Sequence, residues 1–211
     1  MKTKPDESGG CAGMTQRRNI RLLEGEIWGR HVSIETCEGL FSPEHFDRGT
    51  LAMLSHVEIE AGMRIMDLGC GCGVVGIAAA LITGEENVFM SDADPIAVET
   101  ARRNAERNGV GGIDICVSDG FRDVSASGFD LILSNPPYQT DFSVAKGFIE
   151  KGFNRLKIGG RLCMVTKRRE WYKNKLISVF GGVEIRETDG YYVFIAQRRS
   201  MSYAEKAKKR K

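Results

Sequence analysis

Apolar and polar positions along the chain follow a repeating strand-then-helix rhythm. Short apolar runs, typical of buried strands, recur through most of its length. They cover residues 64–67, 87–91, 113–117, 129–134, 161–166, 183–188 and 191–196. Helical spacing of apolar residues separates most of these runs. It predicts helices over 75–82, from Pro95 until Asn108, over 145–156, and in the basic segment that follows residue 166. Nearer the N-terminus, residues 26–35 predict one or two short strands and residues 51–57 a short helix.

Turn and cap residues agree with this order. Asp94-Pro95 is a typical helix start, with Asp as N-cap and Pro in the first turn. Asn108-Gly109 ends that helix, and Gly159-Gly160 is expected to end the helix over 145–156. Asp189-Gly190 between the last two apolar runs predicts a tight hairpin turn. Alternating strands and helices imply a parallel sheet covered on both faces. The predicted fold class is therefore α/β, a Rossmann-like, doubly wound, seven-stranded sheet, mostly parallel with an antiparallel C-terminal hairpin.

A glycine-rich turn follows the first strand of this sheet. Its sequence is Asp67-Leu68-Gly69-Cys70-Gly71-Cys72-Gly73. Ligands of open parallel sheets bind beyond the carboxyl ends of the strands, where glycine lets the backbone approach them closely. The spacing departs from the dinucleotide pattern G-x-G-x-x-G, and no Gly-Lys-Ser/Thr follows as in a P-loop. The turn alone is compatible with a dinucleotide, another nucleoside, or a tight turn without a ligand.

Acidic residues end the next two strands. Asp92 is placed to accept hydrogen bonds from both hydroxyls of a ribose, whereas Asp94 is expected to cap the helix. Asp119 follows the third strand and is a candidate acceptor for the exocyclic amine of a base. It is equally compatible with an ordinary loop acid.

The fourth strand ends in Asn135-Pro136-Pro137-Tyr138. Two prolines hold one backbone geometry there, because proline fixes φ and cannot donate to the sheet. One interpretation is a rigid turn that leaves the sheet. The other is that the Asn135 side-chain carbonyl and the Pro136 backbone carbonyl accept hydrogen bonds from a planar NH₂ group. Tyr138 would then stack on the ring that bears this amine.

These landmarks, in this order, resemble class I S-adenosylmethionine-dependent methyltransferases that modify planar amino groups. The resemblance extends over residues 38–198. Within that class, the stretch from Gly39 to Thr50 resembles the methyltransferase small domain group, particularly small-subunit ribosomal RNA guanine-N2 methyltransferases. The resemblance implies S-adenosylmethionine as the cofactor and direct transfer of its methyl group to an amino nitrogen.

The resemblance also implies individual roles. Asp67 and Gly69 would contact the methionine part of the cofactor, with Thr50 near its carboxylate, and Gly71 and Gly73 would belong to the same cofactor-binding turn. Asp92 would bind the ribose and Asp119 the adenine amine. Asn135, next to the cofactor, and Pro136 would hold the acceptor nitrogen. Pro137 and Tyr138 would contact the target base.

Charge and composition suggest the partner. The chain carries a net charge of +2, yet seven basic residues and one acidic residue fall between Gln197 and Lys211. Lys167, Arg168 and Arg169 follow the fifth strand, at the same sheet edge as the motifs, and are candidate phosphate contacts. RNA, as ribosomal RNA or a ribosomal subunit, is thus the expected partner. The alternatives are adenine N6 of nucleic acid, a glutamine side chain of a translation factor, or an RNA-binding module without turnover.

Other features bound the protein class. No apolar stretch reaches the length of a membrane helix, and the N-terminus lacks the apolar core of a secretory signal. The six cysteines form no C-x-x-C pair, so no metal is expected, and a reducing cytoplasm is the predicted location. A monomer or a homodimer is expected. The predicted organisation is a flexible leader over 1–24, a methyltransferase domain over 25–198 and a basic tail over 199–211.

Overall fold

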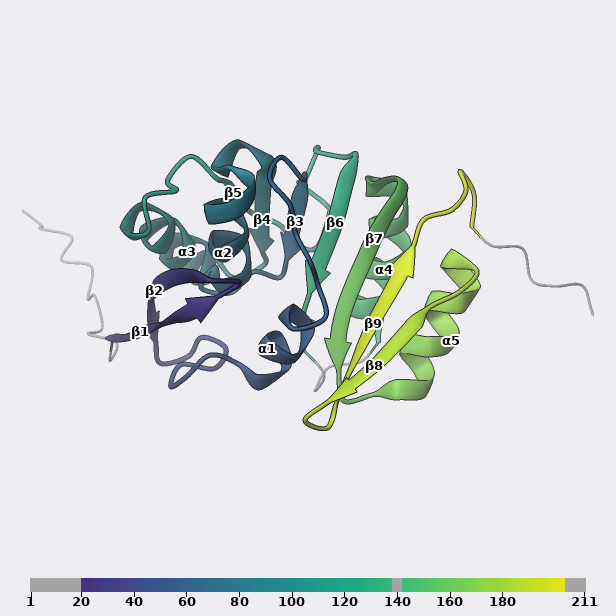
Figure 1. The fold of residues 1–211 in the computed structure, drawn as a ribbon, viewed down its shortest axis with the longest axis horizontal. Helices are drawn as coiled ribbons and strands as arrows, with labels where there is room; N and C mark the ends of the chain where they lie inside the picture. The colour runs from purple at the N-terminus through teal and green to yellow at the C-terminus, as the bar shows by residue number, and fades with distance from the viewer. Residues whose placement is uncertain (1–19, 138–141, 204–211) are drawn as a thin grey trace, which may run out of the picture.

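A seven-stranded sheet forms the centre of the computed structural model, which describes residues 20–137 and 142–203 (Figure 1). Its strands lie in the order β5-β4-β3-β6-β7-β9-β8. Pairing is parallel from β5 to β7 and antiparallel between β7, β9 and β8. This arrangement confirms the predicted fold class. The strand bounds are β3 Ile65–Leu68, β4 Val88–Asp92, β5 Asp114–Val117, β6 Phe129–Ser134, β7 Leu156–Thr166, β8 Glu184–Thr188 and β9 Tyr191–Gln197.

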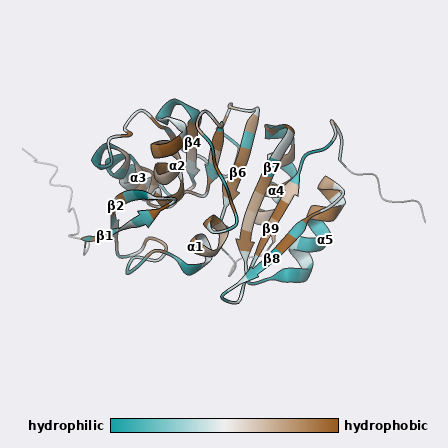
Figure 2. Ribbon diagram, in the orientation of Figure 1, coloured by the Kyte–Doolittle hydropathy of each residue, from teal (hydrophilic) through white to brown (hydrophobic). Residues whose placement is uncertain are grey.

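Helices cover both faces of the sheet. The first three helices lie on one face, and α4 and α5 lie on the other (Figure 1). Figure 2 shows α2 as apolar along its length, which fits a helix buried among the sheet, α3 and the hairpin described below. The helix bounds are α1 Arg48–Leu54, α2 Val74–Thr83, α3 Pro95–Arg107, α4 Ser143–Arg155 and α5 Arg169–Phe180, with a 3₁₀ turn at Glu85–Asn87.

Successive residues of the central strands supply two separate cores. Ile65 of β3 and Leu131 of β6 pack with the α2 and α3 side. Their neighbours Met66 and Ile132 pack with the α4 and α5 side. Side chains alternate between the two faces of a strand, so a strand buried on both sides is apolar throughout. This explains why the central strands lack a polar face.

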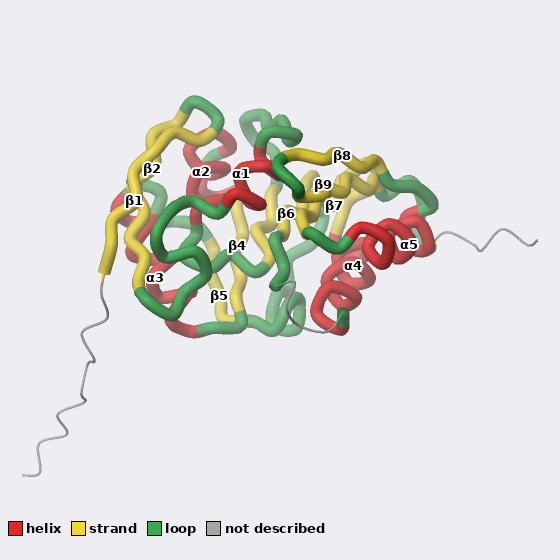
Figure 3. Tube along the Cα trace, turned by 90° about the horizontal axis from the view of Figure 1, so that it is seen from below, coloured by secondary structure: helices red, strands yellow, loops and turns green. Residues whose placement is uncertain are grey.

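An antiparallel hairpin precedes the sheet. It consists of β1 (Ile20–Ile27) and β2 (Arg30–Cys37), and it lies against α2 and α3 (Figure 3). The sequence predicted strand structure only for residues 26–35. Pairing of Ile20 with Cys37 carries β1 six residues further toward the N-terminus. The expected domain start at residue 25 therefore falls inside a strand.

Two asparagine side chains of α3 attach the hairpin. The Asn108 amide exchanges two hydrogen bonds with the backbone of Ser33, at 2.9 and 2.8 Å. The Asn104 amide does the same with Glu35, at 2.7 Å in both directions, and its Nδ2 also donates to Cys72 O at 2.8 Å. The two amides take the place of a neighbouring strand along the edge of β2. Asn104, which is fully buried, also connects the hairpin to the glycine-rich turn.

The boundary between α4 and β7 differs from the prediction. The helix ends at Arg155, and Leu156 begins β7, which continues through Gly159 and Gly160 to Thr166. Residues after β9 stabilise this longer strand, because Gly159 N donates to Arg198 O and Arg198 N donates to Gly160 O. The Arg198 guanidinium is buried and donates to Leu156 O. These partners are distant in the sequence, so helical spacing through Leu156 gave no sign of them.

The expected terminal segments are described only in part. Residues 1–19 of the leader, 204–211 of the basic tail and Tyr138 lie outside the described residues. Within the described part of the tail, Tyr203 donates a hydrogen bond to Glu150 O and its ring packs against Phe153. Among the described residues, no helix is long and apolar enough to cross a membrane.

We predict that Asn104→Ala lowers the free energy of unfolding by about 2 to 4 kcal/mol, because it leaves buried backbone groups of Glu35 and Cys72 without partners. Urea denaturation measures this change. Asn154→Ala is the matched control, since its amide is exposed and donates to Glu150 O within α4. Its expected effect is below about 0.5 kcal/mol. Equal losses in the two variants would contradict the bridging role of Asn104.

Candidate active site

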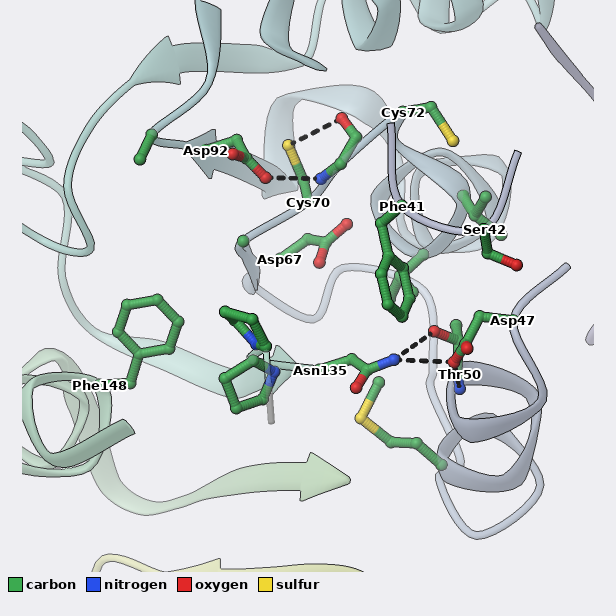
Figure 4. A pocket seen from close by; sticks show the side chains of 18 of the residues that line it. Phe41, Ser42, Asp47, Thr50, Asp67, Cys70, Cys72, Asp92, Asn135 and Phe148 are labelled. Carbon is green, nitrogen blue, oxygen red and sulfur yellow. Dashed lines mark hydrogen bonds between the residues drawn. The ribbon is translucent and has the colours of Figure 1, made fainter. Parts of the chain in front are cut away.

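A cavity of about 340 Å³ opens at the carboxyl ends of the central strands. It lies where β3 has β4 on one side and β6 on the other, the point at which the strand order reverses. The loops after these strands and α1 with the segment before it form most of its wall (Figure 4). Residues of β1, α2 and α4 complete it. The sequence-predicted residues that line it are Thr50, Asp67, Gly69, Gly71, Asp92, Asp119, Asn135, Pro136 and Pro137.

Asp67 lies buried at the base of the cavity. Its Oδ2 accepts a hydrogen bond from Gly76 N at 2.9 Å. Burial raises the pKa of the Asp67 carboxyl to about 7; the Gly76 N–H lowers it, and the charge of Asp92 raises it further. Glycine at position 76 permits this contact, because a Cβ there would stand 2.6 Å from Met90 Sδ. Asp67 is therefore a carboxylate whose charge a bound cation would stabilise.

The glycine-rich turn presents backbone to the cavity. Gly71 has a φ of 55° and donates its N–H to Asp92 Oδ2 at 2.8 Å. Gly73 has a different role from the one the resemblance implied, because it does not line the cavity. It precedes α2 with a φ of 93°, and a Cβ there would meet Met90 and Ile77 within 3.0 Å. Gly73 thus permits close packing of α2 on the sheet.

Asp94 caps a helix, as the sequence predicted, and Asp92 lies in the cavity. Asp94 is the N-cap of α3, and its Oδ1 accepts from Ile96 N at 2.9 Å. Asp92 ends β4 and lines the cavity, with Oδ1 accepting from Asp94 N at 3.0 Å. Each oxygen of Asp92 thus accepts one backbone hydrogen bond, and a carboxylate oxygen can accept two. The remaining capacity suits a pair of hydroxyl groups.

Asn135 is held in one orientation by the first turn of α1. Its Nδ2 donates to Asp47 Oδ2 at 2.8 Å and to Thr50 Oγ1 at 3.1 Å (Figure 4). Because Nδ2 is occupied by these two acceptors, Oδ1 is the amide atom available to accept from a bound amine. The same Asp47 oxygen accepts from Thr50 N, as the N-cap of α1. This cap starts the helix at Arg48, three residues before the predicted start.

Aromatic and proline side chains form the apolar part of the wall. Phe148 of α4 lies beside the turn after β3 and the loop after β5, since it would be 3.8 Å from a Cβ at Gly69 and 3.1 Å from one at Gly120. Pro136 is buried, whereas Pro137 and Asp119 are exposed at the rim. A flat ring could lie against these groups with its polar edge toward Asp119.

The predicted basic residues lie beyond the cavity rather than in it. Lys167, Arg168 and Arg169 are exposed at the end of β7 and the start of α5. Each stands over an aromatic ring: Lys167 over Tyr191, Arg168 over Phe142 and Arg169 over Tyr192. Such contacts order long cationic side chains. The neighbouring Lys175 is engaged in an ion pair with Glu150.

Several cavity residues were not predicted. Asp47 is a typical N-cap residue, an Asp just before a helix, and the sequence alone could have revealed it. Phe41 and Phe148 gave no such signal, because their position depends on the packing of distant segments. Cys70 and Cys72 also line the cavity. Burial raises the pKa of both thiols, that of Cys72 to about 11, so both stay protonated near neutral pH.

The charge of the cavity favours a cationic ligand. Four aspartates line it, Asp47, Asp67, Asp92 and Asp119, and no lysine or arginine does so among the described residues. The described residues also contain no cluster of three or more side chains suited to a metal ion. Carboxylates at the base, backbone at one wall and aromatic rings at the other match a nucleoside that carries positive charge.

Comparison with known proteins agrees with this geometry. The family model described as "Methyltransferase small domain" matches residues 31–195, so the chain belongs to that family. The chain is 33% identical over 168 residues to YbxB of Bacillus subtilis, with 76% of this chain and 83% of that protein covered.

Relatives with named activities are longer. "Ribosomal RNA large subunit methyltransferase G" of Streptomyces avermitilis is 32% identical over 176 residues, which cover 81% of this chain and 46% of that protein. A solved structure described as Thermus thermophilus 16S rRNA N2 G1207 methyltransferase with AdoMet and guanosine is similar with a TM-score of 0.77 and 24% identity, and the match covers 85% of this chain and 51% of that one. The chain thus spans about half the length of these relatives.

We predict that the buried Asp67 makes stability depend on pH. Its pKa is 3.8 in the unfolded chain and about 7 in the folded one. Between these values only the unfolded state loses the proton, so the Asp67 contribution to stability falls as pH rises toward 7. Asp67→Asn removes this loss. The free energy of unfolding of Asp67→Asn minus that of wild type should therefore increase with pH across this range. Above pH 7 this difference should become constant.

Urea denaturation at several pH values measures the difference between the two proteins. Asp119→Asn is the matched control, because Asp119 lines the same cavity in an exposed position. A difference between Asp67→Asn and wild type that stays constant with pH would contradict the prediction.

Proposed function

We propose that the protein is an S-adenosylmethionine-dependent N-methyltransferase that acts on a planar exocyclic amino group, namely guanine N2 in ribosomal RNA. The orientation of the Asn135 amide carries this proposal. Its Nδ2 is bound by Asp47 and Thr50, which leaves Oδ1 to accept from an amine beside a cavity lined by carboxylates. The names of the relatives support RNA as the substrate, because relatives similar in sequence include methyltransferases of large-subunit and of small-subunit ribosomal RNA.

The residues present fit the cofactor. S-adenosylmethionine combines an ammonium, a carboxylate, a sulfonium, a ribose and an adenine. Its net positive charge is opposite in sign to that of a cavity with four aspartates. Asp67 and the backbone at Gly69 and Gly71 would hold the methionine part. Asp92 would accept from the ribose hydroxyls, and Asp119 from the adenine amine. When bound, the cofactor supplies a methyl group that is already strongly electrophilic.

The chain contributes mainly by positioning the acceptor. Asn135 Oδ1 and Pro136 O accept the two hydrogens of the amine, which turns the nitrogen lone pair toward the methyl carbon. The bound cofactor would supply the methyl group: the new N–C bond would form as the C–S bond breaks, with the electron pair left on the sulfur. The nitrogen becomes cationic, so the two carbonyl dipoles stabilise it more strongly than the neutral amine. Its proton leaves to water afterwards, and no histidine base is required.

The basic edge supports an RNA substrate. Lys167, Arg168 and Arg169 follow β7, whose register with β6 pairs Met164 with Ser134, the residue before Asn135. The cations therefore lie at the same end of the sheet as the acceptor site. Phosphate groups that flank a base held at Asn135 can reach them, whereas a small free acceptor would not need them. A base within a duplex would first be flipped out.

We predict that wild-type protein transfers labelled methyl to unmodified ribosomal RNA or ribosomal subunits, and that nucleoside digestion yields N2-methylguanosine. Asn135→Ala should abolish transfer but leave cofactor affinity, measured by calorimetry, within about 3-fold of wild type. It removes an acceptor for the amine, which strengthens binding chiefly in the transition state. Asn154→Ala on the surface of α4 is the control and should transfer normally.

Label found in N6-methyladenosine or in methylglutamine would show that the acceptor is adenine N6 or a glutamine side chain, not guanine N2. Absence of transfer to RNA and to protein extract would refute the enzymatic proposal. Equal loss of transfer and cofactor binding in Asn135→Ala would refute the role assigned to its amide.

We predict that replacing Lys167, Arg168 and Arg169 together by serine weakens RNA binding and flattens its salt dependence. Each lost phosphate contact lowers the slope of log affinity against log salt by about 0.7 on single strands. Filter binding between 50 and 200 mM salt measures the slope, because affinity from phosphate contacts falls strongly over this range. Lys157→Ser, at the opposite end of β7, is the control. An unchanged slope in the triple variant would exclude this edge as the RNA contact.

A further inference from the structure

Asp47 reaches the cavity from a segment far from the other strand-end residues. It lies 88 positions before Asn135 in the chain, yet its Oδ2 stands 2.8 Å from Asn135 Nδ2. The same oxygen accepts from Thr50 N at 2.7 Å, and Thr50 Oγ1 accepts from Asn135 Nδ2 at 3.1 Å. Asn135 is thus tied to both the carboxylate and the hydroxyl of one helical turn (Figure 4).

We propose that Asp47 is a positioning residue that fixes the orientation of the Asn135 amide. This inference rests on the proposed function, in which Asn135 Oδ1 accepts from the acceptor amine. A carboxylate has only acceptor atoms, so Asn135 must turn its NH₂ toward Asp47 and its carbonyl away. Thr50 alone does not impose this choice, because a hydroxyl can donate as well as accept.

The surroundings hold the Asp47 carboxylate in place. Asp47 is the N-cap of α1, with extended backbone angles and a side chain that accepts from the first turn. Gly49 leaves room for this arrangement, since a Cβ there would stand 3.0 Å from Asp47 Oδ2 and 2.8 Å from Tyr191 Cε1. Gly49 therefore brings the first turn of α1 close to Tyr191, and the hydrogen bond from Thr50 N holds the Asp47 oxygen at this turn.

The orientation determines whether the site can hold an amine. A reversed Asn135 amide would turn its two N–H donors toward the amine that receives the methyl group, and this amine carries N–H donors of its own. The amine would then lose one of its two acceptors and the alignment of its lone pair. The negative charge of Asp47 also polarises the amide toward its carbonyl oxygen. A more negative Oδ1 stabilises the cationic nitrogen that forms during transfer.

Asp47→Ser separates this role from helix capping. Serine is a good N-cap, so α1 keeps its start, but the shorter side chain cannot reach Asn135. We expect the single-turnover rate constant for methyl transfer, at saturating cofactor and RNA, to fall about 10- to 100-fold. The melting temperature should stay close to wild type. The dissociation constant of the cofactor should rise by a smaller factor than the rate falls, because the other three aspartates remain in the cavity. Asp47→Asn keeps an oxygen acceptor and should recover part of the rate.

Asp130→Ser is the matched structural control. Asp130 Oδ2 accepts from Arg64 N at 2.8 Å, so it also joins a carboxylate to a backbone amide, but at the amino end of β6. Its replacement should lower stability without lowering the transfer rate. A rate in Asp47→Ser equal to that of Asp130→Ser would overturn the proposal.

A second readout needs no acceptor. In protein labelled with ¹⁵N at asparagine, the Asn135 side-chain NH₂ signals are assigned by their absence in Asn135→Ala. Hydrogen bonds to a carboxylate should shift these proton signals downfield, and Asp47→Ser should move them toward the position of a free amide. If Asp47→Ser does not fold, Asp47→Asn is compared with wild type instead, and its neutral oxygen, a weaker acceptor than a carboxylate, should move the signals part of the way. Signals that do not move would overturn the proposal.

The two readouts distinguish failure of this inference from failure of the proposed function. If wild-type protein methylates no RNA, the acceptor assignment fails, and the NH₂ signals still decide whether Asp47 orients Asn135. If RNA is methylated but neither the rate nor the signals depend on Asp47, only the positioning role fails.

Discussion

Parallel pairing of β3 with β4 and β6 is the constraint on which the rest of the site depends. The register pairs Asp67 with Met90 and Leu133, so the three strands end at nearly the same level. Residues after those ends then converge, although 68 positions separate Asp67 from Asn135 in the chain. Ser134 reinforces the alignment, because its hydroxyl donates to Leu68 O at 2.7 Å. The cavity is therefore a product of strand register, and its polar groups require no long loops to meet.

Concentrating carboxylates at this edge opposes folding. Asp67 is buried, and its pKa of about 7 reports the free-energy cost of its charge. Asp92 offsets part of its own cost through the backbone N–H groups of Gly71 and Asp94. A ligand that brings positive charge would relieve the remaining repulsion. The stability of the protein and its affinity for a cation are thus coupled through the same side chains.

Strand ends and their acids were predictable because their signals are local. An apolar run followed by Asp or by Asn-Pro-Pro identifies both the strand and the residue that leaves it, and Asp94 before Pro95 identifies a cap. Three features were not predictable. Leu156 continues a helical spacing but enters β7, because its partners come from the distant segment around Arg198. Phe148 reaches the cavity only through the packing of α4. Gly73 resembles a ligand-binding glycine, yet it serves the contact between α2 and the sheet.

The asparagine ladder between α3 and β2 has a consequence for how the hairpin can vary. Asn104 and Asn108 bond to the backbone of Glu35 and Ser33, not to their side chains. Substitution on the solvent side of the hairpin therefore leaves these attachments intact, provided that the strand stays extended. Within this fold, β1 and the outward face of β2 form a surface that can diverge between relatives while the glycine-rich turn behind Asn104 keeps its shape. The anchor on β2 consists of backbone atoms that every amino acid except proline possesses.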